Sequence, residues 1–374
     1  MKILDKNLLE KNIRAIAQYD LDKEKVFGSA YLVLDKNETL FCECFGAASM
    51  DGTKPISKRT IYRIASMTKP VTAIATLILV DRGLISLDDS VDKYFPELSN
   101  LEIIALKDGE LVPQGKASRT PTIAECLSHS SGFVSDRGGK MPLATAEDKS
   151  SIENTIKFCA KVGLDFEPGT KAQYSSSAAL DVVAGIIEMV SGKDYRTFLK
   201  DEIFTPLGMF DTDFVPTEEQ WSRFMEVHIM VDGKPAVRKM WDGCVFVDYP
   251  ATRPVAGAGL FSTVTDYALF AKMLLNKGRA GDKQIVSEET FAELTKKRIA
   301  CDTVNYWGLA VRVVQKDHAL PIGAYGWSGA YGSHFWIDPE NEIAAVFMKN
   351  SCFDGGAGTE SGGNFEKAIH DSFI

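Results

Sequence analysis

The first segment suited to nucleophilic catalysis is Ser66-Met67-Thr68-Lys69, which opens an apolar stretch with helical spacing. Positions three residues apart share one face of a helix, so the Lys69 amine can approach the Ser66 hydroxyl. At the start of a helix the Ser66 N–H is not used by the helix, and it can donate to a developing oxyanion. Ser66 is therefore a candidate nucleophile, and a plain helix N-cap is the alternative.

The same pattern occurs a second time, at Ser90-Val91-Asp92-Lys93. An S-x-x-K match arises by chance about once or twice in a chain of this length and composition. The second copy lies in the charged stretch LDDSVDKYFPEL, and no apolar helix follows it. We predict a solvated loop or a helix cap there.

Tyr174 lies just before another apolar segment with helical spacing, and Ser175 and Ser176 follow it. A tyrosine near an ammonium can be held as a phenolate, or it can pass protons between a serine and a lysine. A serine nucleophile needs such a base. The alternative is a buried tyrosine that packs at the start of a helix.

A third segment is rich in glycine: Gly326-Trp327-Ser328-Gly329-Ala330-Tyr331-Gly332. Small residues let a substrate approach the backbone, so an N–H at this edge could complete an oxyanion hole. A common glycine-rich connection between strands is the alternative. The segment is one residue short of the G-x-S-x-G elbow of α/β-hydrolases, and a strand rather than a helix is expected to follow it.

We make separate predictions for two histidines near these motifs. His129 lies in the segment Leu127–Phe133, and we predict a structural hydrogen-bonding role for it. His334 lies on the strand expected after the glycine-rich segment, from which it could approach the site.

The elements that must position these residues differ along the chain. Strand patterns gather at the two ends: a hairpin over Gly28–Ala48, a strand over Trp307–Gln315 and a hairpin over Ser333–Lys349. Helical spacing dominates the middle, over Met67–Arg82, Ser176–Val190 and Thr265–Asn276. We predict an antiparallel sheet flanked by helices and built from residues 1–85 and 295–374, with a largely helical domain of residues 86–294 inserted. The site should lie at their junction.

Composition narrows the class of protein. The 374 residues carry a net charge of -9, which argues against a nucleic-acid partner. The N-terminal segment predicts an amphipathic helix instead of a secretory signal, with one apolar face: Ile3, Leu8, Leu9, Ile13, Ile16 and Ala17. No window approaches 18 uncharged apolar residues, so we expect no membrane span. Seven cysteines without zinc-like spacing favour a reduced, cytoplasmic protein with no metal and no cofactor.

Taken in order, the motifs resemble the serine β-lactamase and penicillin-binding protein superfamily. The chain is most similar to class C β-lactamases and the related family VIII carboxylesterases. Further segments that match the family are Leu87-Asp88-Asp89, Tyr94-Phe95-Pro96, Leu127–Phe133, Pro168-Gly169, Pro206–Met209, Gly259–Thr263 and Asp266.

The resemblance implies an α/β domain from both chain ends, a helical domain between them and a nucleophile at their junction. It implies that Lys69 and Tyr174 together deprotonate Ser66, that an acyl-enzyme forms and that water releases it. By position, the two oxyanion N–H groups would belong to Ser66 and Ala330.

Two departures from the family pattern bear on which substrates the protein accepts. Ser176 stands where the family has an asparagine, and Trp327 stands where it has the lysine of a K-T-G triad, with Ser328 and Gly329 completing the motif. A cation that pairs with a substrate carboxylate contributes about 1.5–3 kcal/mol, and Trp327 offers apolar contact instead. We therefore expect a carboxylesterase that acts on small, neutral, short-acyl esters. The alternatives are a β-lactamase or D-amino-acid peptidase, and a catalytically idle relative that binds a ligand.

Overall fold

The computed structural model describes residues 3–108, 110–133, 147, 150–238, 253–316, 319–353, 356 and 358–374. The larger sheet is built from these strands: β1 (Gly28–Asp35), β2 (Thr39–Gly46), β11 (Ile299–Ala300), β12 (Asn305–Trp307), β13 (Arg312–Val314), β14 (Tyr325–Ser328), β15 (His334–Asp338) and β16 (Ile343–Met348). The helices that pack on the sheet or around the site are α1 (Lys6–Asp22), α2 (Thr68–Asp81), α3 (Ile123–Leu127), α5 (Ala178–Ser191), α6 (Tyr195–Leu199), α9 (Val264–Leu275) and α11 (Glu360–His370).

The other described elements are short or lie away from the sheet. The helices are η1 (Ala65–Met67), η2 (Val91–Lys93), η3 (Pro96–Leu98), α4 (Ile152–Val162), η5 (Lys200–Phe204), α7 (Thr205–Leu207), α8 (Glu218–Ser222), α10 (Glu288–Phe291) and η6 (Ala292–Leu294). The strands pair as β3 (Tyr62–Arg63) with β8 (Phe261–Ser262), β4 (Glu102–Lys107) with β5 (Glu110–Lys116), β6 (His228–Val231) with β7 (Lys234–Val237), and β9 (Arg279–Ala280) with β10 (Lys283–Gln284).

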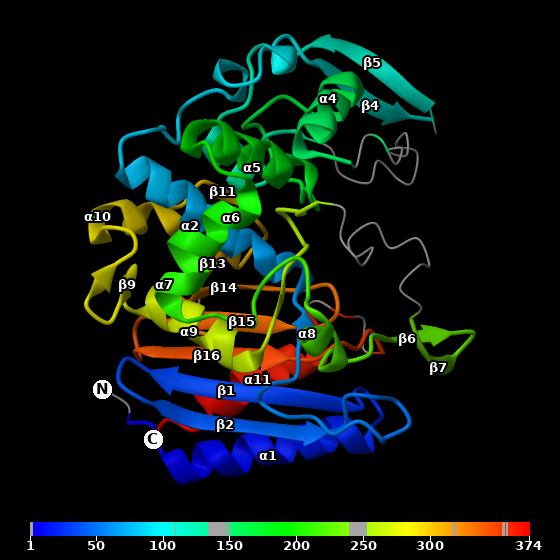
Figure 1. Ribbon diagram of the computed structural model, residues 1–374, viewed down its shortest axis with the longest axis vertical. Coiled ribbons are helices and arrows are strands. Elements are labelled where there is room, and N and C mark those ends of the chain that lie inside the picture. Colours follow the sequence, from blue (N-terminus) through cyan, green and yellow to red (C-terminus); the bar gives the residue numbers. More distant parts are fainter. Residues whose placement is uncertain are drawn as a thin grey trace.

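Both ends of the chain build one sheet. Among the described residues its strand order is β11-β12-β13-β14-β15-β16-β1-β2, and every neighbouring pair is antiparallel. The late strand β16 pairs with the early strand β1, with Ala30 opposite Met348. Figure 1 shows β14, β15, β16, β1 and β2 in the lower half of the molecule, with α2, α4, α5 and α6 above them. The predicted fold class is confirmed.

The two predicted hairpins are confirmed, and carboxylates close their turns. Asp35 Oδ1 accepts from the Asn37 N–H at 2.7 Å between β1 and β2, and Asp338 Oδ1 accepts from the Asn341 N–H at 3.0 Å between β15 and β16. Asn and Asp side chains commonly stabilise turns in this way.

The prediction of one strand over Trp307–Gln315 is wrong, because this segment contains a turn between β12 and β13. The Gly308 N–H donates to the Val311 carbonyl at 3.0 Å, and Ala310 has a φ of +57°. The turn packs against α3, where the Ala310 N–H donates to the Leu127 carbonyl at 2.8 Å. A buried turn is apolar, so its sequence resembles that of a strand.

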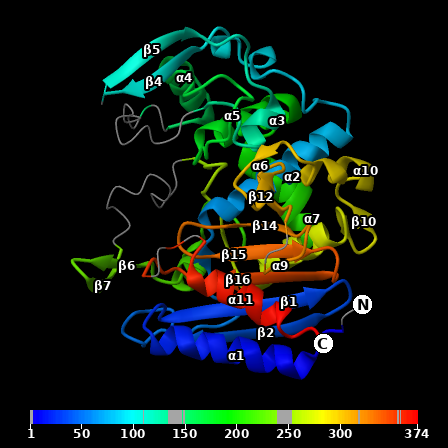
Figure 2. The ribbon, with the colours of Figure 1, turned by 180° about the vertical axis from the view of Figure 1, so that it is seen from behind.

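Helices cover both faces of the sheet. Leu9 and Ile13 of α1 pack with Phe365 of α11 against Tyr31 of β1 and Trp336 of β15. Figure 2 shows α11 in front of the sheet and α1 below it. On the opposite face α9 packs against β1, β15 and β16. Successive side chains of a strand point to opposite faces, so each face of the sheet packs its own set of side chains against helices.

Two helix boundaries differ from the prediction. Ile3 precedes α1, which begins after the N-cap Asp5, and its side chain is 71% exposed. The N-cap of α9 is Thr263, whose hydroxyl accepts from the Asp266 N–H, so Asp266 lies within the first turn.

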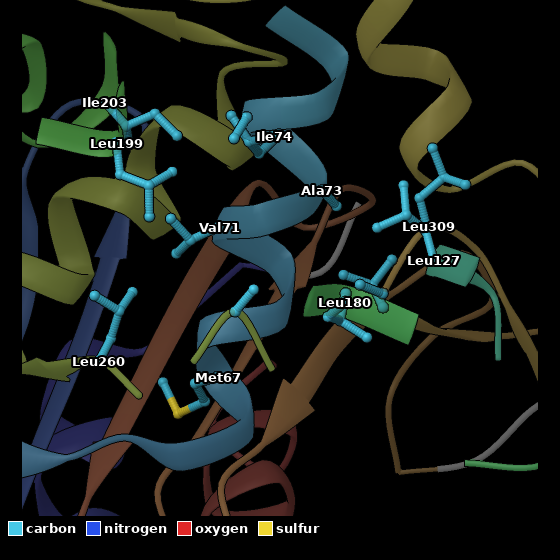
Figure 3. Close-up of a cluster of buried hydrophobic side chains, with 14 of the residues drawn as sticks. Met67, Val71, Ala73, Ile74, Leu127, Leu180, Leu199, Ile203, Leu260 and Leu309 are labelled. Carbon is cyan, nitrogen blue, oxygen red and sulfur yellow. The ribbon is translucent and has the colours of Figure 1, made fainter. Parts of the chain in front are cut away.

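α2 lies at the centre of the molecule, and its residues from Thr68 to Leu79 are buried. Leu199 and Ile203 lie on one side of it, and Leu127 and Leu309 lie on the other (Figure 3). α2 also packs against α5 and α6. A helix that is buried on all sides is held in place by its neighbours, and so are the residues at its N-terminal end.

The domain limits at residues 85 and 295 stay a prediction. α9, which lies within the segment 86–294, packs on the sheet rather than among the other helices of that segment alone. Across the described ranges, no helix is long and apolar enough to cross a lipid bilayer.

Candidate active site

Ser66 lies in the 3₁₀ helix η1, directly before α2. It is partly exposed, whereas its neighbours from Ile61 to Pro70 are buried. The preceding residue, Ala65, has a φ of +43°, a conformation that is uncommon and strained for a residue with a Cβ. The Thr68 hydroxyl donates to the Ala65 carbonyl at 2.7 Å and helps to hold this backbone. The local structure thus turns one serine out of a buried segment.

The Lys69 side chain is buried and contacts Ser66 as the spacing predicts. Its Nζ lies 3.2 Å from Ser66 Oγ, and it donates to the carbonyls of Ser176 and Gly257, each at 2.7 Å. These three oxygens surround Nζ and fix its position. The predicted approach of the amine to the hydroxyl is present.

The Gly257 carbonyl belongs to a loop that sequence reasoning missed. A Cβ at Gly257 would come within 2.4 Å of the Ser176 carbonyl, so only glycine fits here. The loop is anchored by Asp181 of α5, which accepts from the Ala256 N–H at 2.9 Å and pairs with Arg253 at 3.0 Å. No sequence motif connects these residues to Lys69, because the contact joins segments 188 residues apart.

Tyr174 lies beside Lys69 in a group of rings. Lys69 Nζ is 4.7 Å from the centroid of its ring, and Trp327 Nε1 donates to Tyr174 Oη at 3.4 Å. The ring of His129 is 4.6 Å from that of Tyr174, and the rings of Trp307 and Trp327 are also 4.6 Å apart. We call these four residues, His129, Tyr174, Trp307 and Trp327, the aromatic cluster. The aromatic cluster thus brings together three sequence segments that carry His129, Tyr174 and Trp327.

His129 has a structural contact of the predicted kind. Its Nδ1 accepts from the Ser175 N–H at 3.2 Å, next to Tyr174. Burial, with a smaller contribution from the positive charge of Lys69, holds the pKa of His129 well below its usual range. The imidazole is therefore neutral, and its backbone φ is +59°.

The glycine-rich segment lies against the residues that precede Ser66. The Gly329 N–H donates to the Ser333 carbonyl at 2.7 Å, and a Cβ at Gly329 would come within 2.3 Å of the Ile64 carbonyl. Among the backbone hydrogen bonds of the described residues outside regular helices and strands, none has the Ser66 or the Ala330 N–H as its donor. The oxyanion role of these two groups stays a prediction, as do the substrate contacts expected of Ser176, Trp327, Ser328 and Gly329.

In the second S-x-x-K copy the serine and lysine side chains bond to carboxylates, and Ser90 and Lys93 meet through a backbone hydrogen bond of 3.1 Å. Ser90 Oγ donates to Asp92 at 2.6 Å, and Lys93 pairs with Asp89 at 2.8 Å. Ser90 is the N-cap residue of η2, as its charged surroundings indicate.

His334 bonds to two partners, one of which sequence reasoning missed. Its Nδ1 is 2.8 Å from Ser328 Oγ, and its Nε2 is 2.9 Å from Glu366 Oε1. Glu366 lies on α11, far from every motif in the sequence. Within the described part of the chain, no three His, Cys, Asp or Glu residues gather in a way that could hold a metal ion.

Comparison with known proteins assigns the family. A family model described as Beta-lactamase matches residues 10–360. The chain belongs to this family of serine hydrolases.

Individual relatives differ in their named activities. Esterase EstB of Burkholderia gladioli is 27% identical, over 95% of this chain and 94% of that protein. Penicillin-binding protein 4 of Amycolatopsis lactamdurans is also 27% identical, over 79% of this chain and 73% of that protein. The solved structure of EstCE1, a hydrolase with promiscuous acyltransferase activity, has a TM-score of 0.80 and 21% identity, covers 98% of both chains and supports the fold alone.

Proposed function

We propose that this protein is a carboxylesterase that acts on small, uncharged, short-acyl esters through an acyl-enzyme on Ser66. The observation that carries the proposal is the contact of Lys69 Nζ with Ser66 Oγ, beside Tyr174 and Trp327. A relative named as an esterase that aligns over 95% of this chain supports the same choice.

In the acylation step, Ser66 Oγ attacks the ester carbonyl carbon while its proton passes to the Lys69–Tyr174 pair. The two groups share this proton, so the pair is treated as one base. The N–H groups of Ser66 and Ala330 stabilise the negative carbonyl oxygen. The carbon–oxygen bond to the alcohol then breaks, and the alcohol leaves with the proton.

In the deacylation step, water attacks the acyl carbon and gives one proton to the same pair. The bond to Ser66 Oγ breaks, the serine regains its proton and the carboxylic acid is released. Because Lys69 Nζ is fixed by two backbone carbonyls, it stays near Ser66 through both steps.

The preference for uncharged esters rests on Trp327. Its indole packs on Tyr174 with ring centroids 5.5 Å apart, where a lysine would offer a cation to a substrate carboxylate. An aromatic wall favours apolar acyl or alcohol groups. A missing charge-assisted hydrogen bond costs a carboxylate substrate about 1.5–3 kcal/mol.

A β-lactamase or D-amino-acid peptidase activity is the second candidate. It is supported by the family match and by the relative named as a penicillin-binding protein. Turnover of p-nitrophenyl butyrate and of nitrocefin, measured side by side, separates the two. Faster nitrocefin hydrolysis would reverse the order.

Labelling tests the nucleophile itself. A serine-directed phosphonate should add its mass to Ser66, located by peptide mapping. A folded protein that stays unlabelled and hydrolyses neither substrate would instead be a binding relative without catalysis.

A further inference from the structure

The two N–H groups expected to bind the oxyanion belong to segments that are distant in the sequence. Ser66 comes three residues after Arg63 of β3. Ala330 lies in a turn that the Gly332 N–H closes by donating to the Gly329 carbonyl at 2.8 Å. Two donors stabilise one oxygen only when each of them lies about 3 Å from it. Residues that fix these two segments relative to each other therefore bear on the proposed reaction.

Asn350 contacts the first of these segments through its side chain. It is fully buried and lies shortly after β16. Its Oδ1 accepts from the Arg63 N–H at 3.0 Å, and its Nδ2 donates to the Arg63 carbonyl at 2.9 Å and to the Lys349 carbonyl at 2.8 Å. A backbone N–H only donates and a carbonyl only accepts, so these partners assign the oxygen and the nitrogen of the amide. The amide thus binds both polar groups of Arg63, as a neighbouring strand would.

The backbone beside Asn350 contacts the second segment. The Ser351 N–H donates to the Tyr331 carbonyl at 2.9 Å, and Tyr331 directly follows Ala330. Ser351 is fully buried, as Asn350 is. These two consecutive residues therefore connect the segment that leads to Ser66 with the turn that carries Ala330.

The direct contact between the two segments is looser. Ser333 Oγ donates to the Ile64 carbonyl at 3.3 Å, which is longer than each of the three bonds of the Asn350 amide. Hydrogen bonds weaken as the distance grows beyond about 3 Å. The connection through Asn350 therefore holds the two segments more firmly than their direct hydrogen bond does.

We propose that Asn350 is a positioning residue that sets the distance between the N–H groups of Ser66 and Ala330. Negative charge develops on the carbonyl oxygen only as the tetrahedral intermediate forms, so a shift of either donor weakens binding of the transition state more than binding of the substrate. The loss should therefore appear in kcat and leave KM nearly unchanged. The inference rests on the proposed acyl-enzyme function and adds a residue that acts through the backbone of two others.

Asn350→Leu tests the proposal, because leucine has a similar size and makes none of the three hydrogen bonds. We expect kcat for p-nitrophenyl butyrate to fall about 10-fold to 100-fold, with KM changed less than about twofold. Rates are divided by the concentration of active sites, which is titrated to completion with the serine-directed phosphonate. A loss of folded protein therefore does not count as a loss of kcat.

Asn305→Leu is the matched control. Asn305 is also a buried asparagine, and its Nδ2 donates to Asp302 at 2.9 Å within the turn between β11 and β12. Its replacement removes a buried amide of the same kind but leaves both segments as they are. This variant should keep the wild-type kcat per active site.

Asn350→Asp provides a second measurement, which also serves if Asn350→Leu does not fold. The new carboxyl keeps the acceptor for the Arg63 N–H. When it is protonated, its hydroxyl can donate to the Arg63 carbonyl, and when it is ionised, two oxygens repel each other there. Burial raises the pKa of a carboxyl, so the ratio of the variant kcat to the wild-type kcat should fall as pH rises from about 5 to 9.

The possible results separate this proposal from the esterase function. If the wild-type protein hydrolyses the ester and Asn350→Leu keeps its kcat, or changes KM alone, Asn350 does not position the oxyanion donors. Where Asn350→Leu does not fold, a ratio in Asn350→Asp that stays constant with pH overturns the proposal. A wild-type protein that hydrolyses no ester overturns the esterase function, and this inference with it.

Discussion

At the scale of single residues, the proposed function depends on the Ser66 hydroxyl. Ser66 is partly exposed and its Oγ contacts Lys69 at 3.2 Å. We expect Ser66→Ala to lower kcat/KM for p-nitrophenyl butyrate at least about 1,000-fold, because the acyl-enzyme cannot form. The free energy of unfolding, measured in urea, should change by less than about 0.5 kcal/mol.

Ser90→Ala is the matched control for this variant, since it changes the serine of the other S-x-x-K copy. It should leave kcat/KM unchanged, because the Ser90 hydroxyl donates to Asp92. Substantial activity in Ser66→Ala would remove Ser66 from the nucleophile role.

Trp327 allows the proposed substrate preference to be tested. Trp327→Lys places a cation where the family has one, and we expect the ratio of nitrocefin to p-nitrophenyl butyrate turnover to rise about 10-fold to 100-fold, the equivalent of about 1.5–3 kcal/mol. Trp221→Lys, at a surface site 39% exposed, makes the same change elsewhere and should leave the ratio unchanged. An unaltered ratio in Trp327→Lys would show that the missing cation does not set the preference.

Sequence reasoning at this scale succeeded where contacts are local. Ser66 and Lys69 lie three residues apart, so helical geometry alone predicts their contact. The contacts of Lys69 with Gly257 and of His334 with Glu366 join distant segments, and a backbone carbonyl carries no sequence signal. Such partners require knowledge of how the elements pack.

At the scale of elements, α5 controls the position of Lys69 through a loop. Asp181 is fully buried and pairs with Arg253, while its other oxygen accepts from the Ala256 N–H, next to the Gly257 carbonyl that holds Lys69. Asp181→Asn removes the buried carboxylate charge that pairs with the Arg253 guanidinium. We expect the free energy of unfolding to fall by about 3 kcal/mol and kcat/KM to fall at least about tenfold as the loop shifts.

Asp213→Asn is the control for Asp181→Asn. Asp213 also pairs with an arginine, Arg196, but that side chain is 41% exposed. Its removal should cost less than about 1 kcal/mol in urea unfolding. Equal losses in the two variants would mean that burial of the Asp181 pair is not what stabilises the loop.

The hairpins β1–β2 and β15–β16 could be predicted because their strands alternate and polar turns separate them. The turn between β12 and β13 could not, because Gly308–Val311 packs under α3 and is as apolar as a strand. Burial of a turn removes the polar signal on which hairpin prediction depends.

At the scale of the whole molecule, buried histidines make stability depend on pH. Burial lowers the pKa of both His129 and His228. Below the ordinary value of about 6.5, the unfolded chain binds protons that the folded protein does not, so stability falls as pH falls. We expect His129→Asn to reduce this slope between about pH 6.5 and 5 by up to about 1.4 kcal/mol per pH unit.

Asparagine suits the test because it tolerates the positive φ of His129. The measurement is urea unfolding across this pH range. His370→Asn, at an exposed position, should leave the slope as it is. A slope that His129→Asn does not change would mean that this imidazole is charged in the folded protein.

The joining of both chain ends in one sheet leads to a prediction about connectivity. The Ile3 N–H donates to the Ile374 carbonyl at 3.0 Å and the reverse bond has the same length, so a short Gly-Ser linker can connect the described chain ends, residues 3 and 374. A circular permutant opened between Gly281 and Asp282, in the exposed β9–β10 turn, should keep its far-UV circular dichroism and its esterase rate. The same linker with an opening between Leu309 and Ala310, both fully buried, should abolish folding, because the Ala310 N–H bonds to Leu127 of α3. The opposite result, in which the permutant opened at Gly281 fails to fold and the one opened at Leu309 folds, would contradict the prediction. It would mean that neither the closeness of the chain ends nor the burial of the opened peptide bond governs how this sheet assembles.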